Sequence, residues 1–142
     1  MISRVSHATI WVQDQEEARK FYTDVLGFET RFDVKMENGF CWLTVGLKAQ
    51  PDFQVILMEP KVGGKFDAQS AQMLRTLLKN GILGGGVLHT QNCRATYEEL
   101  KRRGVEFIEP PEDKFYGVEA LLRDNSGNWF SMTEPKAMYE KP

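Results

Sequence analysis

The stretch DNSGNWFSMTEP, residues 124–135, decides the fold, because the chain contains nearly the same arrangement once before. It joins a turn signal, Asn-Ser-Gly-Asn, to a short apolar strand that stops at Glu-Pro. The earlier stretch FQVILMEP, residues 53–60, also predicts a strand that stops at Glu-Pro, and the two endings lie 75 positions apart. This echo predicts a chain built from two similar modules, in which Ile56 and Ser131 are equivalent.

The composition is typical of a globular protein of 142 residues, with 42% hydrophobic and 27% charged residues. A net charge of −2 gives no general attraction for nucleic acid or an anionic membrane, and no apolar run approaches membrane-spanning length. Cys41 and Cys93 belong to no CxxC or Cys/His cluster, which excludes a zinc site of that kind. We therefore expect two free thiols in a cytoplasmic protein.

Hydrophobic periodicity predicts the order strand, helix, strand, strand, strand for residues 4–60. The helix should begin after Asp14 and end at Gly27, because an apolar stripe runs between them at helical spacing. The stripe consists of Ala18, Phe21, Tyr22, Val25 and Leu26. Strands are expected over residues 5–12, 28–36, 40–47 and 53–59, with a hairpin turn at Asn38-Gly39.

Residues 84–135 repeat that order, with Asn92 as the helix cap and Gly104 as its end. Strands are expected over residues 84–90, 105–108 and 117–123, and the stretch of residues 124–135 supplies the last strand. The strand over residues 105–108 should be broken by Pro110-Pro111. Residues 61–83 should connect the modules and contain a helix over 68–79; a functional lid is the alternative interpretation. Residues 136–142 form a tail.

Several pieces together resemble the glyoxalase / bleomycin-resistance / extradiol-dioxygenase group, the vicinal oxygen chelate superfamily. They are Val5-Ser6-His7, Phe21-Tyr22 with Leu26-Gly27-Phe28, Leu100 with Gly104-Val105, Tyr116-Gly117, and the DNSGNW of residues 124–129. The resemblance covers residues 4–135 as a single domain. It implies an α+β fold, with two βαβββ modules in tandem forming a curled mixed sheet around one cleft, often within a homodimer.

The resemblance also implies a divalent metal held by one residue from the first and last strands of each module. His7 matches the first ligand position, whereas the other three fall on Ile56, on Gly85 or Gly86, and on Ser131. Ile and Gly offer no donor, Ser is a poor neutral ligand, and one imidazole does not fill such a site. The sequence therefore predicts no cofactor; a divalent metal held by an unconventional set including His7 is the alternative.

His89 does not replace the missing ligand in this alignment. Gly85 precedes the helix-ending Gly104 by 19 residues and His7 precedes Gly27 by 20, but His89 precedes Gly104 by only 15. His89 should therefore lie about 13 Å along the strand from the ligand position.

Strand alternation predicts which side chains face the cleft and turns Glu59 and Glu134 away from it. The predicted ligand pocket consists of His7, Thr9, Trp11, Gln54, Ile56, Met58, His89, Phe115, Tyr116, Trp129 and Ser131, with Val87 and Thr133 on the same faces. These residues make a mostly apolar, aromatic-walled surface that is typical of a small-molecule site. Alternatively, they fill a collapsed interior. His7 is the candidate catalytic base, with a structural, hydrogen-bonded imidazole as the other interpretation.

The sequence thus favours a metal-independent protein that binds a small apolar or aromatic ligand, as a homodimer without nucleic-acid or membrane partners. A metal-dependent lyase, isomerase or dioxygenase that uses His7 is the second hypothesis. A non-catalytic dimerising scaffold is the third.

Overall fold

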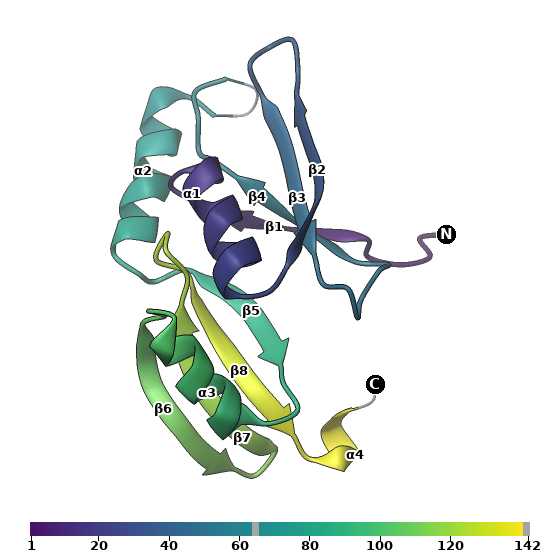
Figure 1. Ribbon diagram of the computed structural model, residues 1–142. Helices are drawn as coiled ribbons and strands as arrows, with labels where there is room; N and C mark the ends of the chain where they lie inside the picture. The colour runs from purple at the N-terminus through teal and green to yellow at the C-terminus, as the bar shows by residue number, and fades with distance from the viewer. Residues whose placement is uncertain (64–65, 141–142) are drawn as a thin grey trace.

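The computed structural model describes residues 1–63 and 66–140, which form two α+β modules in tandem (Figure 1). Module one contains β1 (His7–Trp11), α1 (Gln15–Lys20), η1 (Phe21–Val25), β2 (Glu29–Lys35), β3 (Cys41–Gly46) and β4 (Gln54–Met58). The connector carries α2 (Ala68–Lys79). Module two contains β5 (Gly84–His89), α3 (Cys93–Arg102), β6 (Phe107–Lys114), β7 (Gly117–Arg123) and β8 (Trp129–Pro135), and α4 (Ala137–Glu140) comes after it. The predicted βαβββ order is confirmed in both modules.

Each module forms its own four-stranded mixed sheet. Sheet one has the order β1-β4-β3-β2 and sheet two the order β5-β8-β7-β6. In each sheet the first and last strands of the module pair in parallel, and the remaining pairs are antiparallel. The eight strands therefore make two separate sheets, neither of which closes into a barrel.

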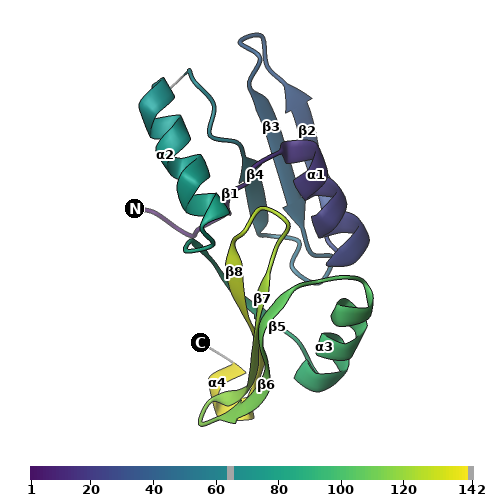
Figure 2. The ribbon, with the colours of Figure 1, turned by 90° about the vertical axis from the view of Figure 1, so that its left-hand side faces the viewer.

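One face of each sheet is covered by the helix of its own module. Figure 2 shows α1 and α3 on the same side of the molecule, with α2 on the opposite side of sheet one. Under α1 the core contains Tyr22, Leu43 and Leu57, each at most 2% exposed. Each such side chain stabilises the fold by about 2 kcal/mol through apolar burial. The other face of each sheet, which we call the open face, carries no helix of its own module.

Two side chains hold the start of α1. Asp14 Oδ1 accepts a hydrogen bond from the Glu17 amide at 2.9 Å, as the predicted N-cap should. Glu59 Oε1 accepts one from the Gln15 amide at 2.7 Å. The carboxylate after β4 therefore satisfies a first-turn N–H that a helix leaves without an intrahelical partner, where negative charge is favourable.

Module two holds the start of α3 with the same two kinds of hydrogen bond. Asn92 caps the Ala95 amide at 3.0 Å, and Glu134 Oε1 accepts from the Cys93 amide at 2.9 Å. The echoed Glu-Pro endings thus anchor the helix of each module. Both glutamates turn toward the helix of their own module, as strand alternation predicted, but Glu59 also lines the cavity described below.

The turn between β7 and β8 is organised by Asp124, which is 5% exposed. Its carboxylate accepts from the amides of Ser126 and Asn128 and from Asn128 Nδ2, each at 2.9 Å. It also accepts from the Tyr22 hydroxyl at 2.7 Å, and Tyr22 lies in module one. Burial is the main cause that raises the pKa of Tyr22 well above its ordinary value, and the neighbouring Asp124 carboxylate adds to the effect.

The same turn makes three more hydrogen bonds to module one. Asn128 Nδ2 donates to Trp11 O at 2.7 Å, the Gln13 amide to Ser126 Oγ at 3.0 Å, and Asn125 Nδ2 to Glu17 O at 2.9 Å. The stretch whose repetition predicted the two modules therefore also links them, through four hydrogen bonds to module one.

Two sequence predictions differ from the structure. Strand β6 does not break at Pro110-Pro111 but continues to Lys114. The prolines fit because β6 is an edge strand, and its pairing with β7 shifts register between Phe107 and Glu109 and again between Glu109 and Glu112. The expected tail contains the short helix α4. Among the described residues, no helix is long and apolar enough to cross a membrane.

Candidate functional site

The predicted pocket residues of module one share the open face of sheet one. The register pairs His7 with Gln54, Thr9 with Ile56, and Trp11 with Met58. On the next strand, Thr44 pairs with Ile56, which places Trp42 in the same row as Met58. The His7 ring lies 6.0 Å from the Trp42 ring, and its Nδ1 is 2.8 Å from Ser6 Oγ.

The predicted residues of module two lie on the open face of sheet two, apart from those of sheet one. Val87 pairs with Ser131 and His89 with Thr133. His89 therefore lies at the far end of β5, away from the glycines that open the strand, which agrees with the spacing argument. Trp129 packs its ring against Gly84 and donates its indole N–H to Ile82 O at 3.3 Å.

A carboxylate that the sequence analysis missed, Glu119, connects three hydroxyl groups on this face. Ser131 Oγ donates to Glu119 Oε2 and the Tyr116 hydroxyl to Oε1, each at 2.5 Å, while Thr133 Oγ1 lies 2.8 Å from Ser131 Oγ. The hydrogen bond to Glu119 is the main reason that the pKa of Tyr116 rises to about 12. Alternation along β7 could have found Glu119, since it pairs with Thr133. Phe115 packs edge to face against the Tyr116 ring, with centroids 5.0 Å apart.

The donor set of the family's metal positions does not fit a metal ion. Ile56 has no donor atom, and the Ser131 hydroxyl is already bonded to Glu119. A side chain on Gly85 would place its Cβ 2.2 Å from Phe130 Cζ, so this position has no room for a ligand and faces the core. Within residues 1–63 and 66–140 no three His, Cys, Asp or Glu side chains come together in a metal-holding group. Metal independence stays a prediction.

A bulge explains how Val87 and His89 reach the open face although Gly85 faces the core. The register of β5 shifts between Gly84 and Gly86, and Gly86 has φ +132 with open space around its Cβ position. Because the bulge inserts one residue, the alternation along β5 shifts by one position and Val87 lies on the open face, where it is 63% exposed.

A cavity of about 510 Å³ lies at the hairpin end of sheet one. Its walls come from the end of the open face, the β2–β3 turn, the start of α1 and the connector. The lining residues are Trp11, Gln15, Asn38, Gly39, Phe40, Cys41, Met58, Glu59, Lys61, Val62, Gly63 and Phe66. Only Trp11 and Met58 belong to the predicted pocket, and the volume is in the usual range for small-molecule sites.

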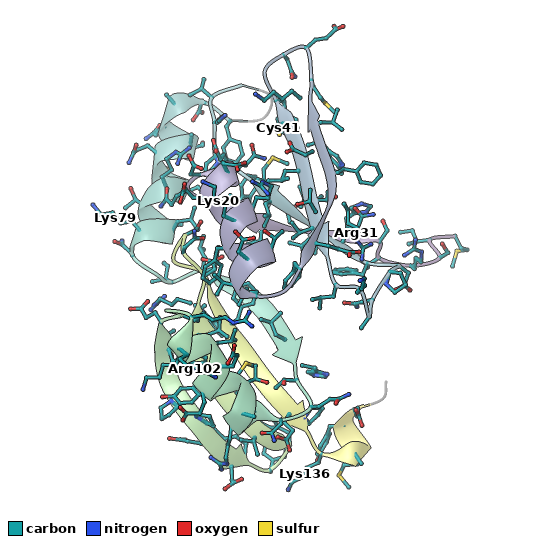
Figure 3. The ribbon with its side chains drawn as sticks, viewed as in Figure 1. Lys20, Arg31, Cys41, Lys79, Arg102 and Lys136 are labelled. Atoms are coloured by element: carbon teal, nitrogen blue, oxygen red, sulfur yellow. The ribbon has the colours of Figure 1, made fainter. Side chains whose placement is uncertain are left out.

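The cavity has aromatic walls and a few polar groups. The Trp11 and Phe66 rings meet edge to face, with centroids 5.2 Å apart and an interplanar angle of 87°. Figure 3 labels Cys41 at this end of sheet one. Burial raises the pKa of the Cys41 thiol, and its hydrogen bond to Asp33 adds to the effect, so the thiol is a weak nucleophile at neutral pH.

Comparisons with known proteins agree with this architecture. The sequence profile of the Glyoxalase/Bleomycin resistance protein/Dioxygenase superfamily matches residues 4–132. The Bacillus subtilis protein YetH, which is uncharacterized, is 28% identical over 134 residues that cover 94% of this chain and 100% of YetH.

Two solved structures are similar over nearly their whole length. UcmS2 is 43% identical with a TM-score of 0.89, covering 94% of this chain and 99% of UcmS2. TnmS3, an antibiotic binding protein from Streptomyces sp. CB03234, is 27% identical with a TM-score of 0.72, covering 95% of this chain and 98% of TnmS3. The fold, the echoed modules and the matched profile together show that the chain belongs to the glyoxalase/bleomycin resistance protein/dioxygenase superfamily.

Proposed function

We propose that this protein binds a small, flat, largely apolar molecule in the cavity at the hairpin end of sheet one, without needing a metal. The observation that carries the proposal is the cavity itself, about 510 Å³ with the Trp11 and Phe66 rings in its wall. The antibiotic-binding protein TnmS3, similar over 95% of this chain, supports a binding function rather than a particular reaction.

Apolar contact supplies enough free energy for measurable binding. A three-ring aromatic compound that buries about 250 Å² gains roughly 6 kcal/mol at about 25 cal/mol per Å². Before the costs of ordering are subtracted, this corresponds to a Kd on the order of tens of micromolar. The cavity therefore suits a ligand that is recognised mainly by shape and aromatic contact.

Phenazine is a suitable probe, because it is flat and uncharged and its absorption overlaps tryptophan emission. We expect saturable quenching of tryptophan fluorescence in the wild type. The Kd obtained from quenching should rise strongly in Trp11→Ala, which removes a ring from the cavity wall and leaves two tryptophans to report binding, and it should be unchanged in Trp129→Phe, since Trp129 lies on sheet two and does not line the cavity. Absence of saturable quenching by phenazine and by a wider panel of planar compounds would sink the proposal.

Metal independence is tested in the same assay. The phenazine Kd should be unchanged after treatment with EDTA and after addition of Mn, Fe(II), Ni, Zn or Co ions. A Kd that requires one of these ions, together with about one ion retained per chain in elemental analysis, would instead favour the enzyme hypothesis with His7 as a ligand.

We further propose that the protein is a homodimer in which a second copy covers the open faces. Apolar side chains on or beside these faces are exposed in the single chain: Phe32 at 52%, Val34 at 48% and Val87 at 63%. Sedimentation equilibrium should give twice the chain mass, and Val87→Glu should shift it toward the monomer. A wild-type monomer at all concentrations would contradict this.

A further inference from the structure

The inner wall of the cavity presents hydrogen-bond acceptors. Gln15 Nε2 donates to Cys41 O at 3.1 Å and to Leu57 O at 2.7 Å, which uses both of its hydrogens. Its Oε1 has no hydrogen-bond partner among the described residues. Beside it lies the Glu59 carboxylate, whose side chain is only 13% exposed.

The Glu59 carboxylate keeps capacity for a ligand. Its Oε1 accepts the Gln15 amide, while Oε2 lies 3.2 Å from Lys61 Nζ and 3.9 Å from an Arg75 nitrogen. An ionised carboxylate offers about four acceptor positions, so at least one is left. The Lys61 side chain is 60% exposed, and an ion pair with so exposed a partner contributes little.

The side-chain N–H donors that line the cavity belong to Trp11, Asn38 and Lys61, in addition to Gln15. Asn38 and Lys61 are exposed, Lys61 Nζ is paired with Glu59, and the thiol of Cys41 already donates to Asp33. A ligand group that faces the Glu59 and Gln15 oxygens must bring its own hydrogen. A ligand oxygen without a hydrogen would face the two acceptors and lose its own bond to water.

Building on the binding function proposed above, we infer that Glu59 and Gln15 determine specificity by accepting a hydrogen bond from a ligand hydroxyl. The ligand class is then a planar polycyclic phenol. Its rings contact Trp11 and Phe66, and its hydroxyl donates to Glu59. A hydrogen bond to an ionised acceptor is about twice as strong as a neutral one, so this contact separates a phenol from its methyl ether.

The internal repeat supplies a matched control for Glu59. Glu134 makes the same bond to the start of its helix, at 2.9 Å instead of 2.7 Å, but it is not among the residues that line the cavity of about 510 Å³. Glu59→Gln and Glu134→Gln both keep an oxygen for the helix amide and remove one negative charge. Because Glu59 also pairs with Lys61 and Arg75, the unfolding free energy of each variant is measured beside binding, and a role in recognition is read from the preference for phenol over ether.

The test uses 2-naphthol and 2-methoxynaphthalene with the wild type, Glu59→Gln and Glu134→Gln, by isothermal titration calorimetry. We expect 2-naphthol to bind the wild type about tenfold more tightly than the ether, as for a hydrogen bond to a charged acceptor. The preference should fall to about threefold or less in Glu59→Gln and stay near tenfold in Glu134→Gln. The ether should bind all three proteins equally.

Several results would overturn the inference. Equal binding of phenol and ether to the wild type would remove phenol recognition but leave the binding function standing. An unchanged preference in Glu59→Gln, or the same loss in Glu134→Gln, would show that Glu59 acts only as a helix anchor. If neither compound bound and phenazine did not quench tryptophan fluorescence, both this inference and the proposed binding function would be refuted.

Discussion

The contact between Tyr22 and Asp124 should be the strongest single polar link between the modules. Tyr22 is 1% exposed and its hydroxyl donates to Asp124 at 2.7 Å. A buried hydrogen bond to a charged group contributes about 1.5–3 kcal/mol. In Tyr22→Phe the carboxylate keeps three other donors from its own turn, so we expect a loss of about 2 kcal/mol in the free energy of unfolding.

Asp124→Ala should cost more. It removes four accepted hydrogen bonds and leaves the Tyr22 hydroxyl and two turn amides without this partner. These losses are not additive, and about 3–5 kcal/mol is the expected total. Urea unfolding followed by circular dichroism gives the free energies. Tyr97→Phe is the control, since the Tyr97 hydroxyl only accepts from the exposed Lys101 and should cost less than about 0.5 kcal/mol.

The same pair predicts an alkaline pH dependence. The pKa of Tyr22 in the folded protein lies well above its ordinary value of 10.0, chiefly because burial disfavours the phenolate. Its contribution to stability is therefore complete below about pH 10 and declines as the pH rises further, because the unfolded chain loses this proton first. Tyr22→Phe should show a shallower decline above about pH 10 than the wild type. An equal slope, or a Tyr22→Phe loss below about 0.5 kcal/mol, would refute the reasoning.

Three further changes have definite outcomes. Gly85→Ala should destabilise by about 1–3 kcal/mol in urea unfolding, because its Cβ would meet Phe130 at 2.2 Å; a neutral result would mean that β5 shifts easily. Iodoacetamide at pH 7.5 should alkylate Cys41 more slowly than free cysteine, and Cys93 more slowly than Cys41. The reason is that burial raises the pKa of both thiols and Cys93 is fully buried. Mass spectrometry that shows fast alkylation of either cysteine in the folded protein would contradict this. Asp67→Ala should speed amide exchange at the start of α2 at pH 7, because the Asp67 carboxylate accepts a hydrogen bond from the Ser70 amide, which also holds the pKa of Asp67 below its usual value. The difference from wild type should vanish as the pH falls through that pKa. A difference that persists at lower pH would exclude the ionised carboxylate as the cause.

Much of the fold could be predicted because its signals are local. The apolar stripe that contains Tyr22 has helical spacing, and Asp14 and Asn92 cap α1 and α3 as expected. The predicted helix over residues 68–79 matches α2. The break at Pro110-Pro111 was wrong because the sequence does not reveal that β6 is an edge strand with shifted register, where missing N–H groups are tolerated.

The candidate site could be predicted only in part, for a similar reason. Alternation along β1 and β4 has a period of two, so the open-face row of Trp11 and Met58 can be read from the strand assignment. Most of the cavity comes from the β2–β3 turn and the connector, where no period relates one side chain to the next. Phe66 reaches Trp11 through the path of the connector, which the sequence pattern does not specify.

The Glu-Pro ending occurs in both modules and has the same structural role in each, but its surroundings differ. After β4 and after β8 the chain places a glutamate at the start of the module's helix, and this requirement is the same in both modules. The two modules differ in the next segment of chain: beyond Glu59 the connector brings Phe66 against Trp11, whereas beyond Glu134 the chain turns into α4, where Tyr139 packs near Phe115. The anchoring bond therefore belongs to the fold, and the cavity depends on the connector. Because Glu59 must already lie at that helix start, enclosure by the connector is the one further step that the recognition role proposed above requires.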